Sequence, residues 1–110
     1  MFAQIKYHKE VSFLLDNYEI NRSTLMILSD SKNSKIIELE DEFKIKTLPT
    51  KIIEENCKMY GSSLEGRKSG TEALIGIKYK APIIISEINR IIFFPTASTR
   101  SEDCSWISLN

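Results

Sequence analysis

The chain has 110 residues, of which 42% are hydrophobic and 27% are charged, and its formal net charge at pH 7 is zero. A chain of this length can bury one hydrophobic core, so we expect a single domain spanning residues 1–110. The neutral balance argues against a strongly basic nucleic-acid-binding tail, and no apolar run is long enough to span a membrane.

The first half of the chain is acidic and is predicted to be mainly β-structure. Residues 10–55 hold ten acidic and six basic side chains. Residues 1–16 fit either an amphipathic helix or a loose arm, and the apolar run Leu25–Leu28 reads as a strand. The composition of residues 29–34 predicts a turn. Residues 35–40 and 43–48 then predict a hairpin that turns at Asp41 and Glu42. The acidic side chains of Glu38, Glu40, Asp41 and Glu42 fit a solvated edge.

A helix is predicted between Pro49 and Tyr60. Proline is favoured in the first turn of a helix, where its missing amide hydrogen costs nothing. Ile52, Ile53, Cys57 and Tyr60 recur at a spacing that gives one apolar face. The glycine at position 61 is suited to end the helix.

The second half reverses the charge balance, with seven basic and three acidic side chains between residues 56 and 100. Residues 71–79 fit either a strand or a short helix. The bulky, β-branched runs Ile83–Ile85 and Ile91–Phe94 predict a hairpin with its turn at residues 86–90. Trp106 and Ile107 predict a last strand. The pattern indicates an α+β fold with a mixed or antiparallel sheet and one or two packed helices.

Two segments of small, hydroxyl and cationic residues stand out as candidate binding loops. Residues 61–70 read GSSLEGRKSG, and residues 95–100 read PTASTR. Hydroxyl, guanidinium and ammonium groups donate hydrogen bonds to anionic oxygen, so the pair could hold phosphates. Ordinary surface loops are the alternative. The candidate residues are Ser62, Ser63, Arg67, Lys68, Ser69, Thr96, Ser98, Thr99 and Arg100.

The first of these loops differs from a nucleotide-binding P-loop. Gly61 and Gly66 have the spacing of GxxxxGKS/T, but Arg67 precedes Lys68 and displaces the lysine from its position. The helix predicted before the loop also replaces the strand that such a loop follows. We therefore do not expect nucleotide hydrolysis. Catalytic constellations are also missing from the sequence, so we expect no enzyme, and a small phosphate-handling enzyme is only a third, weaker hypothesis.

No cofactor or metal site is expected from the remaining chemistry-bearing residues. Cys57 and Cys104 form no CxxC pair, and His8 is the only histidine. Cys57 falls on the apolar face of the predicted helix and is interpreted as a core residue. The first residues lack the uninterrupted apolar core of a signal peptide, so we expect a cytoplasmic protein with reduced thiols.

Five ordered blocks in residues 56–108 resemble the bacterial competence transcription factors, the ComK family. Residues 57–71 match its GSS-x-x-GRK-x-GT signature, and residues 80–83 match KxPI. Residues 92–96, 98–100 and 104–108 are similar to its FxFPT, STR and C-x-WIS blocks. Residues 1–55 fit the family only loosely.

The resemblance implies a DNA-binding activator of competence for genetic transformation. Members of this family bind A/T-rich promoter boxes, largely through the minor groove, and act as homo-oligomers. An adaptor also delivers them to a Clp-type protease. For this chain the resemblance implies a cytoplasmic, nucleoid-associated regulator whose DNA contacts come from the candidate residues of the two loops.

Length suggests an alternative. Members of the family continue well beyond the WIS block, whereas this chain ends two residues after it. A truncated remnant of the factor, which does not activate transcription and binds only protein or nothing, is therefore the competing hypothesis.

Overall fold

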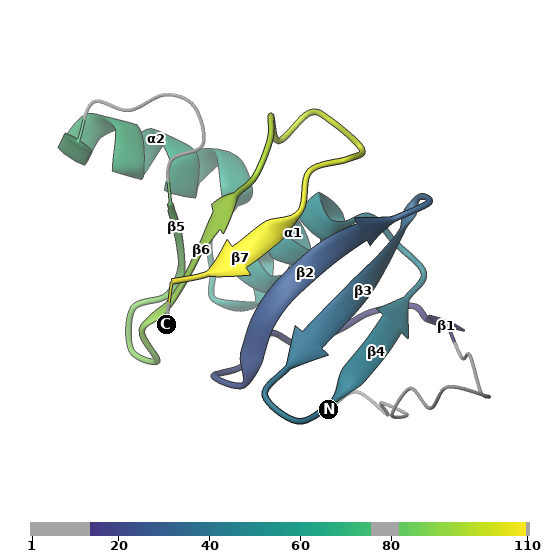
Figure 1. The fold of residues 1–110 in the computed structure, drawn as a ribbon. Coiled ribbons are helices and arrows are strands. Elements are labelled where there is room, and N and C mark those ends of the chain that lie inside the picture. The colour runs from purple at the N-terminus through teal and green to yellow at the C-terminus, as the bar shows by residue number, and fades with distance from the viewer. Residues whose placement is uncertain (1–13, 76–81, 110) are drawn as a thin grey trace.

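A seven-stranded sheet runs through the computed structural model, which describes residues 14–75 and 82–109 (Figure 1). Neighbouring strands are antiparallel except β1 and β4, which are parallel. The strands follow the order β1-β4-β3-β2-β7-β6-β5. Their bounds are Leu14–Leu15 (β1), Thr24–Asp30 (β2), Asn33–Glu38 (β3), Glu42–Ile45 (β4), Ile83–Ser86 (β5), Ile91–Pro95 (β6) and Trp106–Ser108 (β7). With two helices, this sheet confirms the predicted α+β class.

Strands β2, β3 and β4 form a meander, in which the predicted strand and the predicted hairpin are joined by a tighter turn than the one expected at residues 29–34. Only Ser31 and Lys32 separate β2 from β3, and both have positive φ angles of 47° and 70°. This conformation matches the right-handed twist of the flanking strands. The turn between β3 and β4 lies at residues 39–41, so Glu42 belongs to a strand and not to the turn.

Helix α1, Pro49–Met59, forms where it was predicted. It ends in a Schellman motif, in which the amides of Gly61 and Ser62 donate to the carbonyls of Lys58 and Cys57, each at 3.0 Å. Gly61 has the positive φ of 75° that this cap requires. Tyr60 lies beyond the helix and is 37% exposed, so its predicted place on the buried face is wrong.

Helix α2, Leu64–Ile75, replaces most of the predicted loop at residues 61–70. Its start is fixed by Ser63, whose Oγ accepts a hydrogen bond from the Gly66 amide at 3.0 Å. Leu64 is buried in the core and anchors the first turn. The helix also settles residues 71–75 of the segment left open as strand or helix, whereas residues 76–79 lie outside the described part, as do residues 1–13.

The hairpin β5–β6 and the last strand β7 form as predicted, with the hairpin turn at residues 87–90. β7 lies between β2 and β6, so it joins the meander to the hairpin. One row of paired residues crosses the sheet on its covered face, and all of them are buried: Phe43, Ile36, Ile27, Trp106 and Pro95.

Both helices supply side chains to the core on this covered face. Ile52 and Ile53 of α1 and Leu64 of α2 belong to the same buried cluster as the strand residues. The buried Asn56 side chain links α1 to the segment before β2, because it bonds the Ile20 amide at 2.8 Å and the Tyr18 carbonyl at 2.9 Å. Neither described helix is long and apolar enough to cross a membrane.

Candidate nucleic-acid interface

The two candidate segments adjoin in the folded chain. Figure 1 places α2 and the connection from β6 to β7 at the same end of the molecule. Lys68 Nζ, on α2, donates a hydrogen bond to Thr99 Oγ1 on that connection at 3.1 Å. The sequence did not show whether the segments share a surface, because 31 residues separate these two side chains. Their contact defines a single surface of hydroxyl and cationic groups.

Arg67 is more restrained than its place in the sequence suggested. Its Nε donates to Ser62 Oγ at 2.9 Å, and its guanidinium lies 3.6 Å from the Glu87 carboxylate. Ser62 Oγ in turn donates to the Cys57 carbonyl at 3.1 Å. Arg67 therefore ties the start of α2 to the end of α1 and to the β5–β6 turn, and its side chain is only 22% exposed.

Lys68 and its neighbours on α2 are more accessible to a ligand. Among the described side chains, Lys68 has one carboxylate neighbour, Glu65, at 3.6 Å, and the Glu65 side chain is 85% exposed. A solvent-exposed ion pair of this kind is weak, so a phosphate could replace Glu65 as the partner of Lys68. Ser63 and Ser69 are exposed, although the Ser63 hydroxyl is engaged in capping the helix.

Hydroxyl groups within the connection between β6 and β7 fix its backbone through hydrogen bonds. Thr96 bonds the backbone of Ser105 through both its amide, at 2.9 Å, and its hydroxyl, at 3.1 Å. Ser98 Oγ accepts from the Arg100 amide at 3.3 Å. The exposed Arg100 guanidinium has no hydrogen-bond or ion-pair partner within the described ranges, which leaves it free for an anion.

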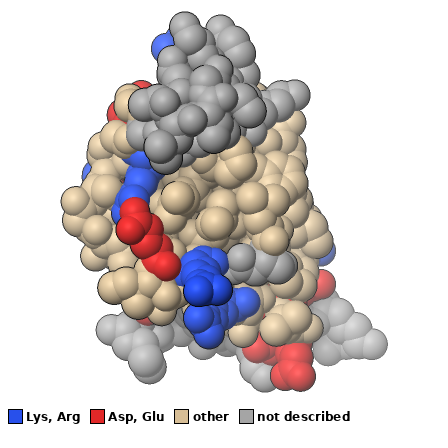
Figure 2. All heavy atoms as spheres, turned by 90° about the vertical axis from the view of Figure 1, so that its left-hand side faces the viewer, with Lys and Arg blue, Asp and Glu red and all other residues tan. Residues whose placement is uncertain are grey.

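Charge on this side of the molecule is mixed. Figure 2 shows Lys and Arg side chains next to Asp and Glu side chains on a face that is largely uncharged. Glu102 and Asp103 are also exposed on the connection that carries Arg100. The cations of the two candidate segments therefore share this side of the molecule with acidic side chains, which reduce its positive charge.

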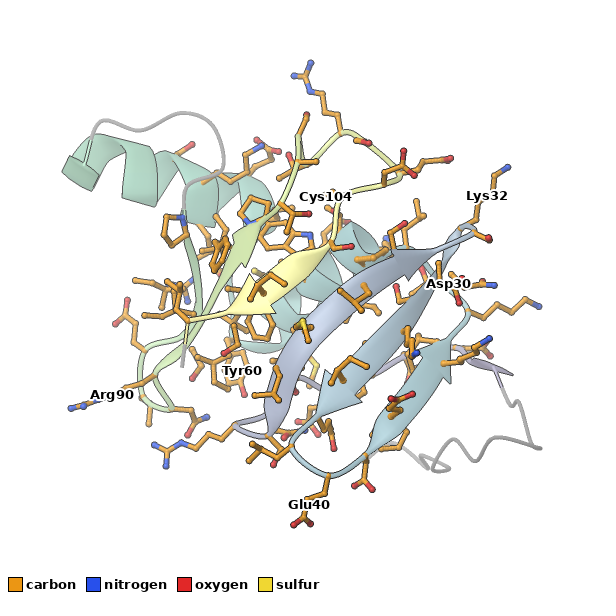
Figure 3. The ribbon with its side chains drawn as sticks, in the orientation of Figure 1. Asp30, Lys32, Glu40, Tyr60, Arg90 and Cys104 are labelled. Carbon is orange, nitrogen blue, oxygen red and sulfur yellow. The ribbon has the colours of Figure 1, made fainter. Side chains whose placement is uncertain are left out.

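A second group of cations lies at the β5–β6 turn, and sequence reasoning missed it. Arg90 extends away from this turn into solvent (Figure 3) and has a positive φ of 56°. Arg22, which precedes β2, donates through Nε to the Asn89 carbonyl at 3.3 Å. Arg22 and Arg90 are 68 positions apart in the chain, and the hydrogen bond of Arg22 to Asn89 is what brings Arg22 to the turn that carries Arg90.

The cysteines do not form a reactive or metal-binding centre. Cys57 and Cys104 are free and fully buried, and burial raises the pKa of the Cys57 thiol. A raised pKa leaves a thiol protonated and unreactive. Within the described ranges no group of three or more His, Cys, Asp or Glu could hold a metal ion. His8 lies outside those ranges.

Fold and surface together define a small α+β protein with a candidate anion-binding surface of lysine, arginine and hydroxyl groups. A family model described as ComK protein matches residues 15–110. The competence transcription factor of Bacillus subtilis (strain 168) is 38% identical to this chain over an alignment of 98 residues that covers 86% of the chain. The chain therefore belongs to the ComK family.

The match covers 51% of the Bacillus subtilis relative, so the chain spans about half the length of that protein. No solved structure matches the chain. The activity and partners of a complete family member are therefore matters of proposal for this chain.

Proposed function

We propose that this chain is a DNA-binding unit of a regulator of competence for genetic transformation. Membership of the ComK family supports this function, and the relative that it resembles is a competence transcription factor. The observation that carries the DNA contact is the Lys68–Thr99 hydrogen bond, which joins α2 and the β6–β7 connection into one surface. The proposed ligand is A/T-rich double-stranded DNA.

Within this surface the side chains have different proposed roles. Lys68 and Arg100 contact phosphates or enter the minor groove, because A/T-rich minor grooves are narrow and attract cationic side chains. Ser69, Ser98 and Thr99 add neutral donors to the DNA backbone. Arg67 and Ser62 hold α2 in position through their mutual hydrogen bond, and Ser63 and Thr96 fix the backbone on either side.

The proposal extends to the setting in which the protein acts. A regulator that reads paired boxes needs an oligomer whose spacing matches them, so we propose a homo-oligomer on DNA. We also propose a cytoplasmic, nucleoid-associated protein that is not an enzyme and needs no cofactor. An adaptor of a Clp-type protease is proposed as a protein partner.

Titration of an A/T-rich duplex across a salt series tests the DNA contact. Each phosphate contact contributes about 0.9 to the slope of log affinity against log salt, so Lys68→Gln should reduce the magnitude of the slope by about 0.9. Arg100→Gln should have the same effect. Lys46→Gln is the matched control, because Lys46 is an exposed cation that follows β4 near the other edge of the sheet. Equal slopes for Lys68→Gln and Lys46→Gln would exclude this surface.

The competing proposal is that this chain binds protein and not DNA. One observation favours it: the carboxylates of Glu87 and Glu65 lie 3.6 Å from Arg67 and Lys68 and offset their positive charge. It predicts a folded chain that binds the protease adaptor but no duplex at low salt. Measurable duplex affinity that falls with salt and with Lys68→Gln would contradict it.

A further inference from the structure

A row of apolar side chains crosses the face of the sheet opposite the helices. Strand register pairs Ile37 with Met26, Met26 with Ile107, and Ile107 with Phe94. The paired residues Ile84 and Ile92 extend the same face across β5 and β6. All six side chains are half-buried, unlike the fully buried row that alternates with them. We call these six residues the open-face strip.

The rest of this face carries charged side chains, as a surface exposed to water normally does. Over β3 and β4 it carries ion pairs between Lys35 and Glu42, at 3.6 Å, and between Lys44 and Asp30, at 3.8 Å. A one-sided antiparallel sheet normally alternates apolar residues on the covered face with polar residues on the other. Strands β3 and β4 mostly follow that rule, whereas β5, β6 and β7 are apolar on both faces.

The described helices do not cover the open-face strip. In Figure 1 the strip's face is turned toward the viewer, and α1 lies behind the sheet. α1 and α2 contribute to the core on the far face through Ile52, Ile53 and Leu64. A contiguous apolar surface rimmed by charges is typical of an interaction site.

We infer that the open-face strip is the docking surface for the part of the ComK-family polypeptide that this chain does not match. The Bacillus subtilis relative is 38% identical to this chain, yet the match covers only 51% of it. That unmatched half is the occupant that we infer for the open-face strip of the half that the two proteins share. A sheet that is apolar on both faces is normally sandwiched between two layers. The inference does not depend on DNA binding.

The methyl resonances of two methionines test the inference in the unmodified chain. Met26 belongs to the open-face strip, whereas Met59 is on α1 and is 49% exposed. The probe is a polypeptide that comprises the residues of the Bacillus subtilis relative outside the match. Adding it should shift the Met26 methyl resonance and leave that of Met59 in place, and size-exclusion chromatography with light scattering should show a one-to-one complex.

Matched variants measure the contribution of the strip. Met26→Lys should weaken the complex about tenfold or more, because a tenfold change is about 1.4 kcal/mol and burial of a methionine side chain is worth at least that. Met59→Lys should leave the affinity within about twofold, since Met59 is outside the strip. Trp106 fluorescence would show that both variants remain folded.

Two outcomes overturn the inference. One is a homodimer of this chain that perturbs Met26 and is not displaced by the probe, which would make a second copy the occupant. The other is an unshifted Met26 resonance both with the separate probe and with the probe joined to the chain by a flexible linker. The joined form covers the case in which the probe does not fold alone.

Discussion

The buried Tyr18 hydroxyl shows how single residues connect distant parts of this chain. It lies 2.6 Å from Thr24 Oγ1 and donates to the Glu38 carboxylate. Burial, together with the Glu38 hydrogen bond, raises the pKa of Tyr18 well above its usual range. Glu38 was predicted to belong to a solvated acidic edge. Glu38 is half-buried instead, because it accepts a hydrogen bond from Tyr18, 20 residues earlier in the chain. The run of acidic residues alone gives no sign of this partner.

Tyr18→Phe should lower the free energy of unfolding at neutral pH. As the pH rises above about 10, the variant should lose less stability than the unmodified protein. At pH 7 the variant removes one hydrogen bond from Thr24 and one from Glu38, and among the described residues each of them keeps only its bond to Asn21. Losing these two bonds costs about 1–3 kcal/mol. Since the folded-state pKa lies above the unfolded value of about 10, the stabilisation is complete below about pH 10 and is lost as pH rises further. Urea unfolding from about pH 7 to 11 should show the two proteins converging.

The exposed Tyr60 supplies the control for that comparison. Tyr60→Phe removes a hydroxyl from a ring that is 37% exposed, so stability at pH 7 should not change. A gap between Tyr18→Phe and the unmodified protein that stays constant above about pH 10 would contradict the proposed role of the hydroxyl.

Among the elements, α2 marks the limit of prediction from sequence. Strands β2 to β7 and α1 follow from local patterns, because β-branched runs and the Pro49 start have few alternative structures. Strand β1 does not, since its residues lie in the segment expected to be a helix or a loose arm. Residues 64–70 contain two glycines and one serine, a composition typical of a loop. The helix depends on the Ser63 cap and on burial of Leu64, and the second is a tertiary effect. The closeness of the two candidate segments could not be predicted from the sequence either, because Lys68 contacts Thr99 only after the sheet has formed.

Gly61→Ala should destabilise the junction between α1 and α2. A residue with a side chain pays about 1–2 kcal/mol for the left-handed conformation that Gly61 adopts at φ 75°. A Cβ at this position would meet no atom within 4 Å, so the cost comes from the backbone alone. Gly61→Asn should cost less, because asparagine tolerates this conformation. Thermal unfolding of both variants would test the order, and an equal loss in the two would rule out the backbone explanation.

At the scale of the whole molecule, β7 decides whether the chain folds as one unit. This strand of three residues lies between β2 and β6, so it connects the meander near the beginning of the chain to the later hairpin. Trp106 anchors it, with a fully buried ring whose Nε1 donates to Thr50 Oγ1 of α1 at 3.0 Å. The sequence predicted the strand but not its central position, which depends on pairing with residues about 80 positions away.

Trp106→Ala should therefore weaken both halves of the sheet together. Removing a buried tryptophan costs about 3–5 kcal/mol, a large share of the 5–15 kcal/mol typical of a whole protein. Hydrogen exchange would measure the effect separately for amides of β3 and of β6, and we expect both sets to accelerate by the same factor. Ile88→Ala, at a turn residue that is 91% exposed, should leave both unchanged. If β3 kept its protection while β6 lost it, the meander would be an independent unit, and β7 would only attach the hairpin to it.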